Sequence, residues 1–330
     1  TERIRASGLS KKRVRGMSHC LITGAAGYVG QKLLAALSAR KMFERIVALD
    51  VRPPQNLPPG VSFLQKDIRD RDLLALLRPY RLACAVHFAF VVNPIHNEKE
   101  MYDINVNGTL NLLGACAELG VPHLILASSA SAYGARPDNP PFMSEEHPIR
   151  PFRSFSYAWH KGLIEEYLKD YVKAHPEMTV SVIRPCIIYG PHVDNYLSRY
   201  WRKMPLVPLI NGLDPPFQFV HEDDVVDFIL GLLKKKRAGA FNVAPDDTVS
   251  YSEVARMMGK RTMRLPFALV YLLVFLLWHF RYLEMPPGAL YFTMYPWTVD
   301  NRRGKEEVGY RYRYSTRETA AVLVSKLRRK

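Results

Sequence analysis

Short apolar runs alternate with segments of helical periodicity along the first half of the chain. Runs at 19–23, 45–50, 61–65, 82–89 and 123–128 are short and mostly apolar, like strands that are buried on both faces of a sheet. Between them, helices are predicted after residue 27, from 70 to about 77, and from about 98 to 120. This alternation predicts an α/β fold with a doubly wound parallel sheet that is covered by helices on both faces.

A glycine-rich turn, TGAAGYVG at 23–30, joins the first predicted strand to the first predicted helix. Gly24 permits a tight turn, Gly27 lets the backbone approach a pyrophosphate, and Gly30 lets the helix pack close to the strand. Strand, turn and helix in this order are the context in which such a motif binds a dinucleotide. Without that context the pattern is weak, because glycine-rich turns also serve purely conformational needs.

An acidic residue, Asp50, ends the second predicted strand, twenty residues after Gly30. A carboxylate in this place accepts hydrogen bonds from an adenosine ribose, which favours NAD as the cofactor. Its coincidence with the glycine turn favours this role over that of a plain turn or cap residue. Arg52 leaves NADP open as an alternative, because a guanidinium would neutralise a 2′-phosphate.

The composition indicates the size of the folded core and the redox compartment of the protein. The chain has 330 residues, 48% of them apolar, which is enough for one large core or for a main domain with a smaller lobe. The four cysteines lie inside predicted strands or helices without CxxC spacing, so we expect buried thiols in a reducing, cytoplasmic compartment and no zinc or disulfides. We interpret His87 and His160 as structural, and predict no metal site.

Much of the net charge of +15 lies at the two ends of the chain. Residues 1–16 hold six basic residues without apolar periodicity, and we expect a disordered extension or a non-native remnant there. The basic C-terminal segment, 311–330, ends in KLRRK. Because no nucleic-acid motif accompanies these charges, we expect solvated tails and no nucleic-acid partner.

Tyr157 and Lys161 lie four residues apart at the start of another predicted helix, and therefore on one face. A nearby ammonium and an oxidised nicotinamide would favour the phenolate and bring the pKa of the phenol closer to working pH. Tyr157 could then exchange a proton with a substrate hydroxyl or carbonyl while hydride moves to or from the cofactor. A YxxxK pair is frequent by chance, so the pair alone favours a surface role.

Ser129 favours a catalytic role for Tyr157 and Lys161 over a surface role, because it follows the fifth predicted strand. The carboxyl ends of parallel strands face the cofactor crevice, where a hydroxyl can hydrogen-bond the reacting oxygen and stabilise charge on it. The alternative is a turn serine, which is common in such loops.

A series of motifs occurs in order along residues 17–260. They are TGAAGYVG at 23–30, Asp50 at its strand end, Asp67-Ile68, HFA at 87–89, NVNGT at 105–109, SSASAYG at 128–134, Tyr157 with Lys161, Arg184-Pro185, YGP at 189–191 and FVHEDD at 219–224. As a set they resemble the extended short-chain dehydrogenase/reductase superfamily, in the branch that holds nucleotide-sugar epimerases and dehydratases and 3β-hydroxysteroid-type dehydrogenases. The resemblance implies a Rossmann-type fold and an enzyme.

The resemblance also implies a role for each matching position. Tyr157 is expected to act as acid/base, Lys161 to anchor the nicotinamide ribose and lower the tyrosine pKa, and Ser129 to contact the reacting oxygen. Asn105 is expected to support the active site from its helix. The residues expected to bind the cofactor are Gly24, Gly27, Tyr28, Val29, Gly30, Asp50, Arg52, Asp67, Ile68, Phe88, Ala89, Tyr157, Lys161 and Pro185.

One departure from the nucleotide-sugar pattern concerns phosphate binding. Those members usually carry an arginine just before the FVHxDD stretch, whereas residues 214–218 here are DPPFQ. A bidentate phosphate contact is therefore missing, which weakens a sugar-nucleotide substrate unless Arg199, Arg202 or Lys203 compensates.

The second departure is an apolar segment at 265–280, bounded by Arg264 and Arg281. Its 16 residues are short for a membrane span, which needs about 20. It fits a buried helix of the smaller lobe, the wall of a lipophilic substrate site, or a monotopic membrane contact aided by the arginines. We favour the buried helix, because helices that are apolar on all sides are most often buried.

These observations predict a Rossmann-type domain at 17–188, to which 219–244 returns, and a substrate lobe formed by 189–218 and 245–310. The leading hypothesis is an NAD(P)-dependent oxidoreductase that interconverts a secondary alcohol and a ketone on a fairly apolar small molecule. The alternative is a nucleotide-sugar 4-epimerase or dehydratase with tightly held NAD. A cofactor-sensing protein without catalysis is disfavoured by the presence of Ser129, Tyr157 and Lys161. We expect a homodimer.

Overall fold

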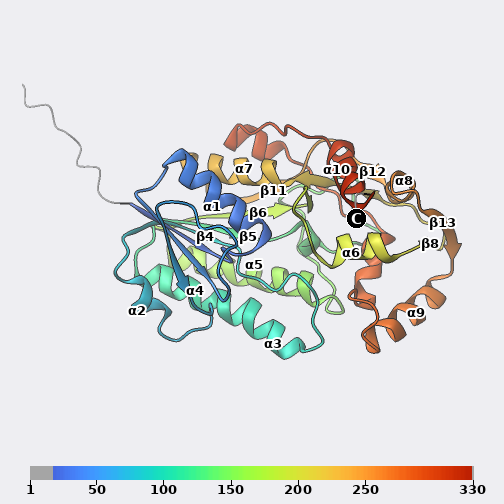
Figure 1. Ribbon diagram of the computed structural model, residues 1–330, viewed down its shortest axis with the longest axis horizontal. Coiled ribbons are helices and arrows are strands. Elements are labelled where there is room, and N and C mark those ends of the chain that lie inside the picture. The colour runs from blue at the N-terminus through green and yellow to red at the C-terminus, as the bar shows by residue number, and fades with distance from the viewer. Residues whose placement is uncertain (1–17, 329–330) are drawn as a thin grey trace, which may run out of the picture.

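A seven-stranded parallel sheet is the centre of the computed structural model, which describes residues 18–328 (Figure 1). Its strands are β1 (His19–Thr23), β2 (Arg45–Asp50), β3 (Val61–Gln65), β4 (Leu82–His87), β5 (His123–Ala127), β6 (Thr179–Pro185) and β11 (Gly239–Val243). The order is β11-β6-β5-β4-β1-β2-β3, and each neighbouring pair is parallel. The predicted doubly wound α/β fold of Rossmann type is confirmed.

Helices cover both faces of this sheet (Figure 1). On one face lie α1 (Tyr28–Arg40) and α7 (Glu222–Lys235), and on the other α2 (Leu73–Leu77), α4 (Gly108–Glu118) and α5 (Ser156–Ala174). Leu34 and Phe228 belong to the core on the first face, and Leu112 and Leu168 to the core on the second. The strands are therefore buried from both sides, which explains their unbroken apolar sequences.

Smaller elements gather at one end of the sheet (Figure 1). Three two-stranded sheets pair β7 (Ile187–Tyr189) with β10 (Phe219–His221), β9 (Pro216–Phe217) with β12 (Val249–Ser250), and β8 (Leu206–Ile210) with β13 (Arg261–Leu265). The helices are α6 (Tyr196–Lys203), α8 (Tyr251–Met257), α9 (Phe267–His279) and α10 (Thr316–Arg328). Their shared core is aromatic: the Tyr251 ring lies 5.2 Å from that of Trp201 and 5.1 Å from that of Phe217.

Two predicted elements differ from the observed ones at their ends. The helix predicted from 70 begins at Leu73, because Asp70 forms a turn in which its side-chain Oδ1 accepts a hydrogen bond from the Asp72 nitrogen and its carbonyl accepts one from the Leu73 nitrogen. The predicted helix from 98 to 120 consists of α3 (Glu98–Tyr102), a π-helical segment (Asp103–Asn107) and α4 in succession.

The prediction of a buried helix at 265–280 is wrong. Only Val270 and Val274 of α9 are buried, whereas the side chains on its other sides, such as Leu272 at 53% and Phe275 at 46%, are exposed. The physical reason is that the fold supplies neighbours along one side of α9 only, from β8, from the 3-10 helix Pro287–Thr293 and from His96, whose ring stacks on Trp278. No helix within residues 18–328 has the length and apolar character needed to cross a membrane.

The predictions for the cysteines, for a metal site and for the two ends of the chain can also be compared with the structure. All four cysteines are free and buried, and residues 18–328 contain no cluster of His, Cys, Asp or Glu that could hold a metal ion. The segment 1–16, for which we predicted an extension, and the last two residues, Arg329 and Lys330, lie outside the described part of the chain.

Candidate active site and cofactor pocket

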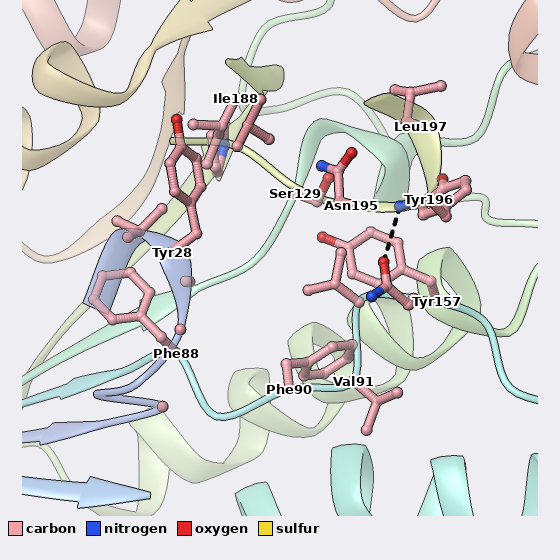
Figure 2. Close-up of a pocket in the computed structure, with 18 of the residues that line it drawn as sticks. Tyr28, Phe88, Phe90, Val91, Ser129, Tyr157, Ile188, Asn195, Tyr196 and Leu197 are labelled. Carbon is pink, nitrogen blue, oxygen red and sulfur yellow. Dashed lines mark hydrogen bonds between the residues drawn. The ribbon is translucent and has the colours of Figure 1, made fainter. Parts of the chain in front are cut away.

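A cavity of about 1050 Å³ opens along the carboxyl ends of β1, β2, β4, β5 and β6 (Figure 2). It includes the point between β1 and β4 where the strand order reverses, which is where open α/β sheets bind ligands. All residues that the sequence assigned to the cofactor line it, namely Gly24, Gly27, Tyr28, Val29, Gly30, Asp50, Arg52, Asp67, Ile68, Phe88, Ala89, Tyr157, Lys161 and Pro185.

The glycine turn leaves space that any side chain would fill. Gly24 has a φ of 69°, and a Cβ there would lie 2.5 Å from the backbone nitrogen of Ala89. A Cβ at Gly30 would lie 2.3 Å from the carbonyl oxygen of Gly24, so α1 packs directly against the turn. No side chain caps α1, which leaves its first amides without competition for an anion. This cradle fits the pyrophosphate of a dinucleotide.

Asp50 connects the end of β2 to the glycine turn. Its Oδ2 accepts a hydrogen bond of 2.9 Å from the backbone nitrogen of Ala26, and its Oδ1 accepts one of 3.2 Å from that of Arg52. The carboxylate therefore holds a defined position on the cavity wall, with lone pairs left for a ribose hydroxyl.

Replacing Asp50 by alanine is expected to weaken NAD binding about tenfold or more. It should also reduce the difference between the affinities of the protein for NAD and for NADP. The carboxylate repels a 2′-phosphate and accepts charge-assisted hydrogen bonds from a ribose, and the variant lacks both effects. Titration of the protein and the variant with both cofactors measures this. Tighter binding of NADP than of NAD to the unchanged protein would contradict the assignment and give the main role to Arg52.

Ser129 and Tyr157 meet on one side of the cavity, across from Tyr28 and Phe88 (Figure 2). Ser129 follows β5, and its Oγ accepts hydrogen bonds from the backbone nitrogen and the hydroxyl of Ser131, at 3.1 and 2.9 Å. Its own proton is thus free to be donated to the phenol oxygen or to a substrate oxygen. Burial raises the pKa of Tyr157 above its usual value, and the hydrogen bond with Ser129 acts in the opposite direction.

Lys161 lies one helical turn after Tyr157 on α5 and is only 4% exposed. Its Nζ donates a hydrogen bond of 2.6 Å to the Ala127 carbonyl and lies 3.4 Å from the centre of the Phe90 ring, against 5.9 Å for Tyr157. Burial lowers the pKa of Lys161 to about 7, although the carboxylate of Glu165 acts in the opposite direction.

Asn105 does not reach the cavity. It is fully buried, and it holds the backbone of Val91 through a hydrogen bond of 2.7 Å to its Oδ1 and one of 3.3 Å from its Nδ2. Because residues 88–93 line the cavity, we place Asn105 among the positioning residues and not among those that contact substrate.

The two histidines that we interpreted as structural lie behind the cavity wall. His87 is buried between the hydroxyls of Thr23 and Thr109, at 2.7 and 2.9 Å, and burial lowers its pKa to about 3. Burial lowers the pKa of His160 to about 4, and its ring contacts the Asn105 amide at 3.3 Å. Both side chains are therefore neutral at neutral pH and serve as hydrogen-bonding partners.

An ion pair that the sequence analysis missed lies next to the candidate catalytic residues. Arg184 on β6 and Glu165 on α5 are both buried and approach to 2.5 Å. The Ser128 hydroxyl donates a hydrogen bond to Glu165, and Arg184 donates one of 2.6 Å to the hydroxyl of Tyr133. The available signal was spacing, since Glu165 follows Lys161 by four residues on the same helix face.

The far end of the cavity is walled by aromatic rings. Phe217 stands just before the FVHEDD stretch, in the region where the nucleotide-sugar pattern has its arginine. It lines the cavity with Tyr251 and Trp297, whose rings lie 5.1 and 6.1 Å from its own. The sequence pointed to the missing arginine but could not show that these three rings come together.

Basic side chains are concentrated at the other end of the cavity. The lysines and arginines that line it are Arg52, Lys66, Arg69 and Lys161, and the first three lie beside the ends of β2 and β3. The suggested replacements for the missing arginine, Arg199, Arg202 and Lys203, do not line it. Arg199 instead pairs with Glu284 at 2.6 Å.

None of residues 265–280 lines the cavity, so their interpretation as a substrate wall is also wrong.

A sequence profile of the NAD dependent epimerase/dehydratase family matches residues 20–244, which are 225 of the 330 residues. The chain therefore belongs to this family and is an NAD-dependent enzyme. The family agrees with the resemblance found in the motifs and with the cofactor predicted from Asp50.

The chain is also similar to individual proteins. An uncharacterised protein of Mycobacterium tuberculosis is 28% identical over 307 residues, which cover 90% of this chain and 81% of that protein. UDP-glucose 4-epimerase 2 of Oryza sativa is 32% identical over 202 residues, 56% of this chain and 48% of its own. The structure of MoeE5 in complex with UDP-glucuronic acid and NAD matches with a TM-score of 0.73 and 24% identity, covering 94% of this chain and 99% of that one. At this identity the structural match shows the fold alone.

Proposed function

We propose that the protein is an NAD-dependent oxidoreductase that interconverts a secondary alcohol and a ketone on a fairly apolar substrate. The observation that supports this most is the aromatic wall of Phe217, Tyr251 and Trp297, which carries no lysine or arginine of its own. Such a wall favours burial of hydrocarbon and offers no guanidinium to a diphosphate. The substrate would bind between this lobe, 189–218 and 245–310, and the large sheet.

In this proposal Tyr157 holds and moves the proton. During oxidation its Oη takes the proton of the substrate hydroxyl, while the Ser129 hydroxyl donates a hydrogen bond to the same substrate oxygen. NAD, held by the glycine turn and Asp50, would accept the hydride, and the positive charge of its oxidised ring would favour the phenolate. Lys161 lies beside Tyr157 on α5, where it would hold the nicotinamide ribose. Asn105 would keep the cavity loop at Val91 in place.

A nucleotide-sugar 4-epimerase or dehydratase is the second candidate. It is favoured by the sequence similarity to UDP-glucose 4-epimerase 2 of Oryza sativa and by solved relatives in complex with UDP-glucose or UDP-glucuronic acid. The same serine and tyrosine would serve this reaction, but the cofactor would be reduced and reoxidised within one turnover. The two candidates therefore differ in net production of NADH. NADP as a second cofactor and a homodimer stay predictions.

The purified protein is expected to form net NADH from NAD with apolar secondary alcohols, such as sterol-like ring alcohols, and not with UDP-sugars. Absorbance of NADH measures the first, and chromatography of the sugar products measures interconversion without net reduction. The Tyr157→Phe variant is the control, because any true product must depend on it. Saturable micromolar binding of a UDP-sugar with interconversion of the sugar and no net NADH would overturn the proposal in favour of the epimerase.

A further inference from the structure

Helix α9 and the strand before it present a surface that is both apolar and basic. We define the α9 surface by the exposed basic and large apolar residues of this segment, which are Arg261, Met263, Arg264, Leu269, Tyr271, Leu272, Leu273, Phe275, Leu276, Leu277, Phe280, Arg281 and Tyr282. In Figure 1, α9 lies at the lower right, at the edge of the smaller elements. Its only buried side chains are Val270 and Val274.

So much exposed hydrocarbon on one helix requires a covering partner. Leu272, Phe275 and Phe280 are 53%, 46% and 64% exposed, and large contiguous apolar patches on soluble proteins mark interaction sites. The helix has 13 residues, which give a length of roughly 20 Å, well below the ~30 Å of a hydrocarbon core. A bilayer contact would therefore place α9 along the interface and not across it.

The charges around α9 indicate which partner fits. Residues 254–283 contain no aspartate or glutamate but five lysines and arginines, at 256, 260, 261, 264 and 281. None of Arg261, Arg264 and Arg281 forms a salt bridge with any residue of the described chain. A second copy of this chain docked on the same face would bring these positive charges together, whereas anionic lipid headgroups would neutralise them.

Aromatic side chains flank the aliphatic part of the helix. Phe267 and Tyr271 lie in its first half, and Trp278, Phe280 and Tyr282 lie at its C-terminal end. Tryptophan and tyrosine are enriched at the boundary between hydrocarbon and headgroups, so the positions of Tyr271, Trp278 and Tyr282 fit an interfacial helix.

We propose that the α9 surface binds an anionic bilayer as a monotopic contact, with its leucines and Phe275 in the acyl boundary and its arginines on the headgroups. The contact lies beside the active site: the His96 ring stacks on Trp278 at 4.0 Å, and Ile95 of the same loop lines the active-site cavity. Membrane binding therefore brings this wall of the cavity close to the lipid.

Flotation with lipid vesicles tests the proposal. The full protein is expected to bind vesicles of phosphatidylcholine mixed with phosphatidylglycerol, to bind those of phosphatidylcholine alone more weakly, and to lose the difference as salt is raised. Replacing Arg261 and Arg264 together by glutamine should weaken binding to the anionic vesicles about fivefold per charge and change binding to neutral vesicles little.

Apolar variants separate insertion from simple charge attraction. The double variant Leu272→Asn and Leu276→Asn should weaken vesicle binding about tenfold or more, because asparagine does not enter the acyl boundary. Leu57→Asn is the matched control, since Leu57 is exposed to 48% in the loop between β2 and β3, outside the α9 surface. All variants should keep the NAD affinity of the parent, which shows that they fold.

Two results would overturn the proposal. One is the absence of flotation with anionic vesicles at low salt, or flotation that the two asparagines leave unchanged. The other is a dimer in sedimentation velocity that the two asparagines dissociate in a protein that does not float, because a second copy of the chain would then cover α9.

Discussion

Replacing Tyr157 by phenylalanine is expected to lower turnover by about 10²-fold or more, which is the size of a general acid/base contribution. The phenol lies against Ser129 in the cavity, and the variant keeps the ring while it removes the only atom of that side chain that can carry a proton. Folding and NAD binding should change little, since the Phe90 and Phe155 rings still pack against the same ring. Turnover on a verified substrate and a cofactor titration measure the two effects.

Tyr196 offers the matched control for this experiment. Its ring also lines the cavity, and Tyr196→Phe deletes an equivalent hydroxyl that we do not place in proton transfer. We expect a much smaller loss of turnover for this variant. Near-normal turnover of Tyr157→Phe, or equal losses in the two variants, would show that Tyr157 is not the proton donor.

Replacing Arg184 by methionine is expected to lower the free energy of unfolding by about 3–5 kcal/mol. Both members of the Arg184–Glu165 pair are more than nine-tenths buried, so the variant leaves a carboxylate in the core without its counter-charge. Burial acts to lower the pKa of Arg184, but Glu165 and the hydroxyl of Tyr133 together raise it above its usual value. Urea titration measures the change.

A surface pair on the same helix provides the comparison. Lys169 and Glu166 form an ion pair whose side chains are 61% and 70% exposed, and Lys169→Met should alter stability by about 0.5 kcal/mol or less. The double variant Glu165→Gln with Arg184→Met should regain part of the loss, because no unpaired charge remains. A loss for Arg184→Met no larger than that for Lys169→Met would refute this account of the pair.

The helix α9 shows where sequence periodicity fails. Its segment is apolar on all sides, and this pattern is typical of a buried helix. Burial, however, depends on how many neighbours the fold provides, and here they contact only the side that carries Val270 and Val274. The composition of the segment therefore predicted the helix, while its environment depended on contacts with β8, Pro287–Thr293 and His96, which lie elsewhere in the chain.

The wall of the cavity also could not be predicted from local sequence patterns. Phe90, which lies under Lys161, and the three rings at the substrate end come from loops and elements that are separated by up to 207 residues, from Phe90 to Trp297. None of them belongs to a local motif. Glu165 and Arg184 likewise form their pair only because α5 packs on the sheet next to β6.

By itself the sequence determined the parallel sheet, the glycine turn with Asp50, and the order of motifs that marks the family, because each of these depends on residues close together in the chain. Parallel strands place their carboxyl ends on one edge, so residues after successive strands, such as Ser129, could also be assigned to that edge. Only the tertiary structure decided that Phe217, Tyr251 and Trp297 form one wall, that Arg184 pairs with Glu165, and that α9 faces outward. These features depend on which distant segments pack together, and short-range patterns of apolar and polar residues do not predict that packing.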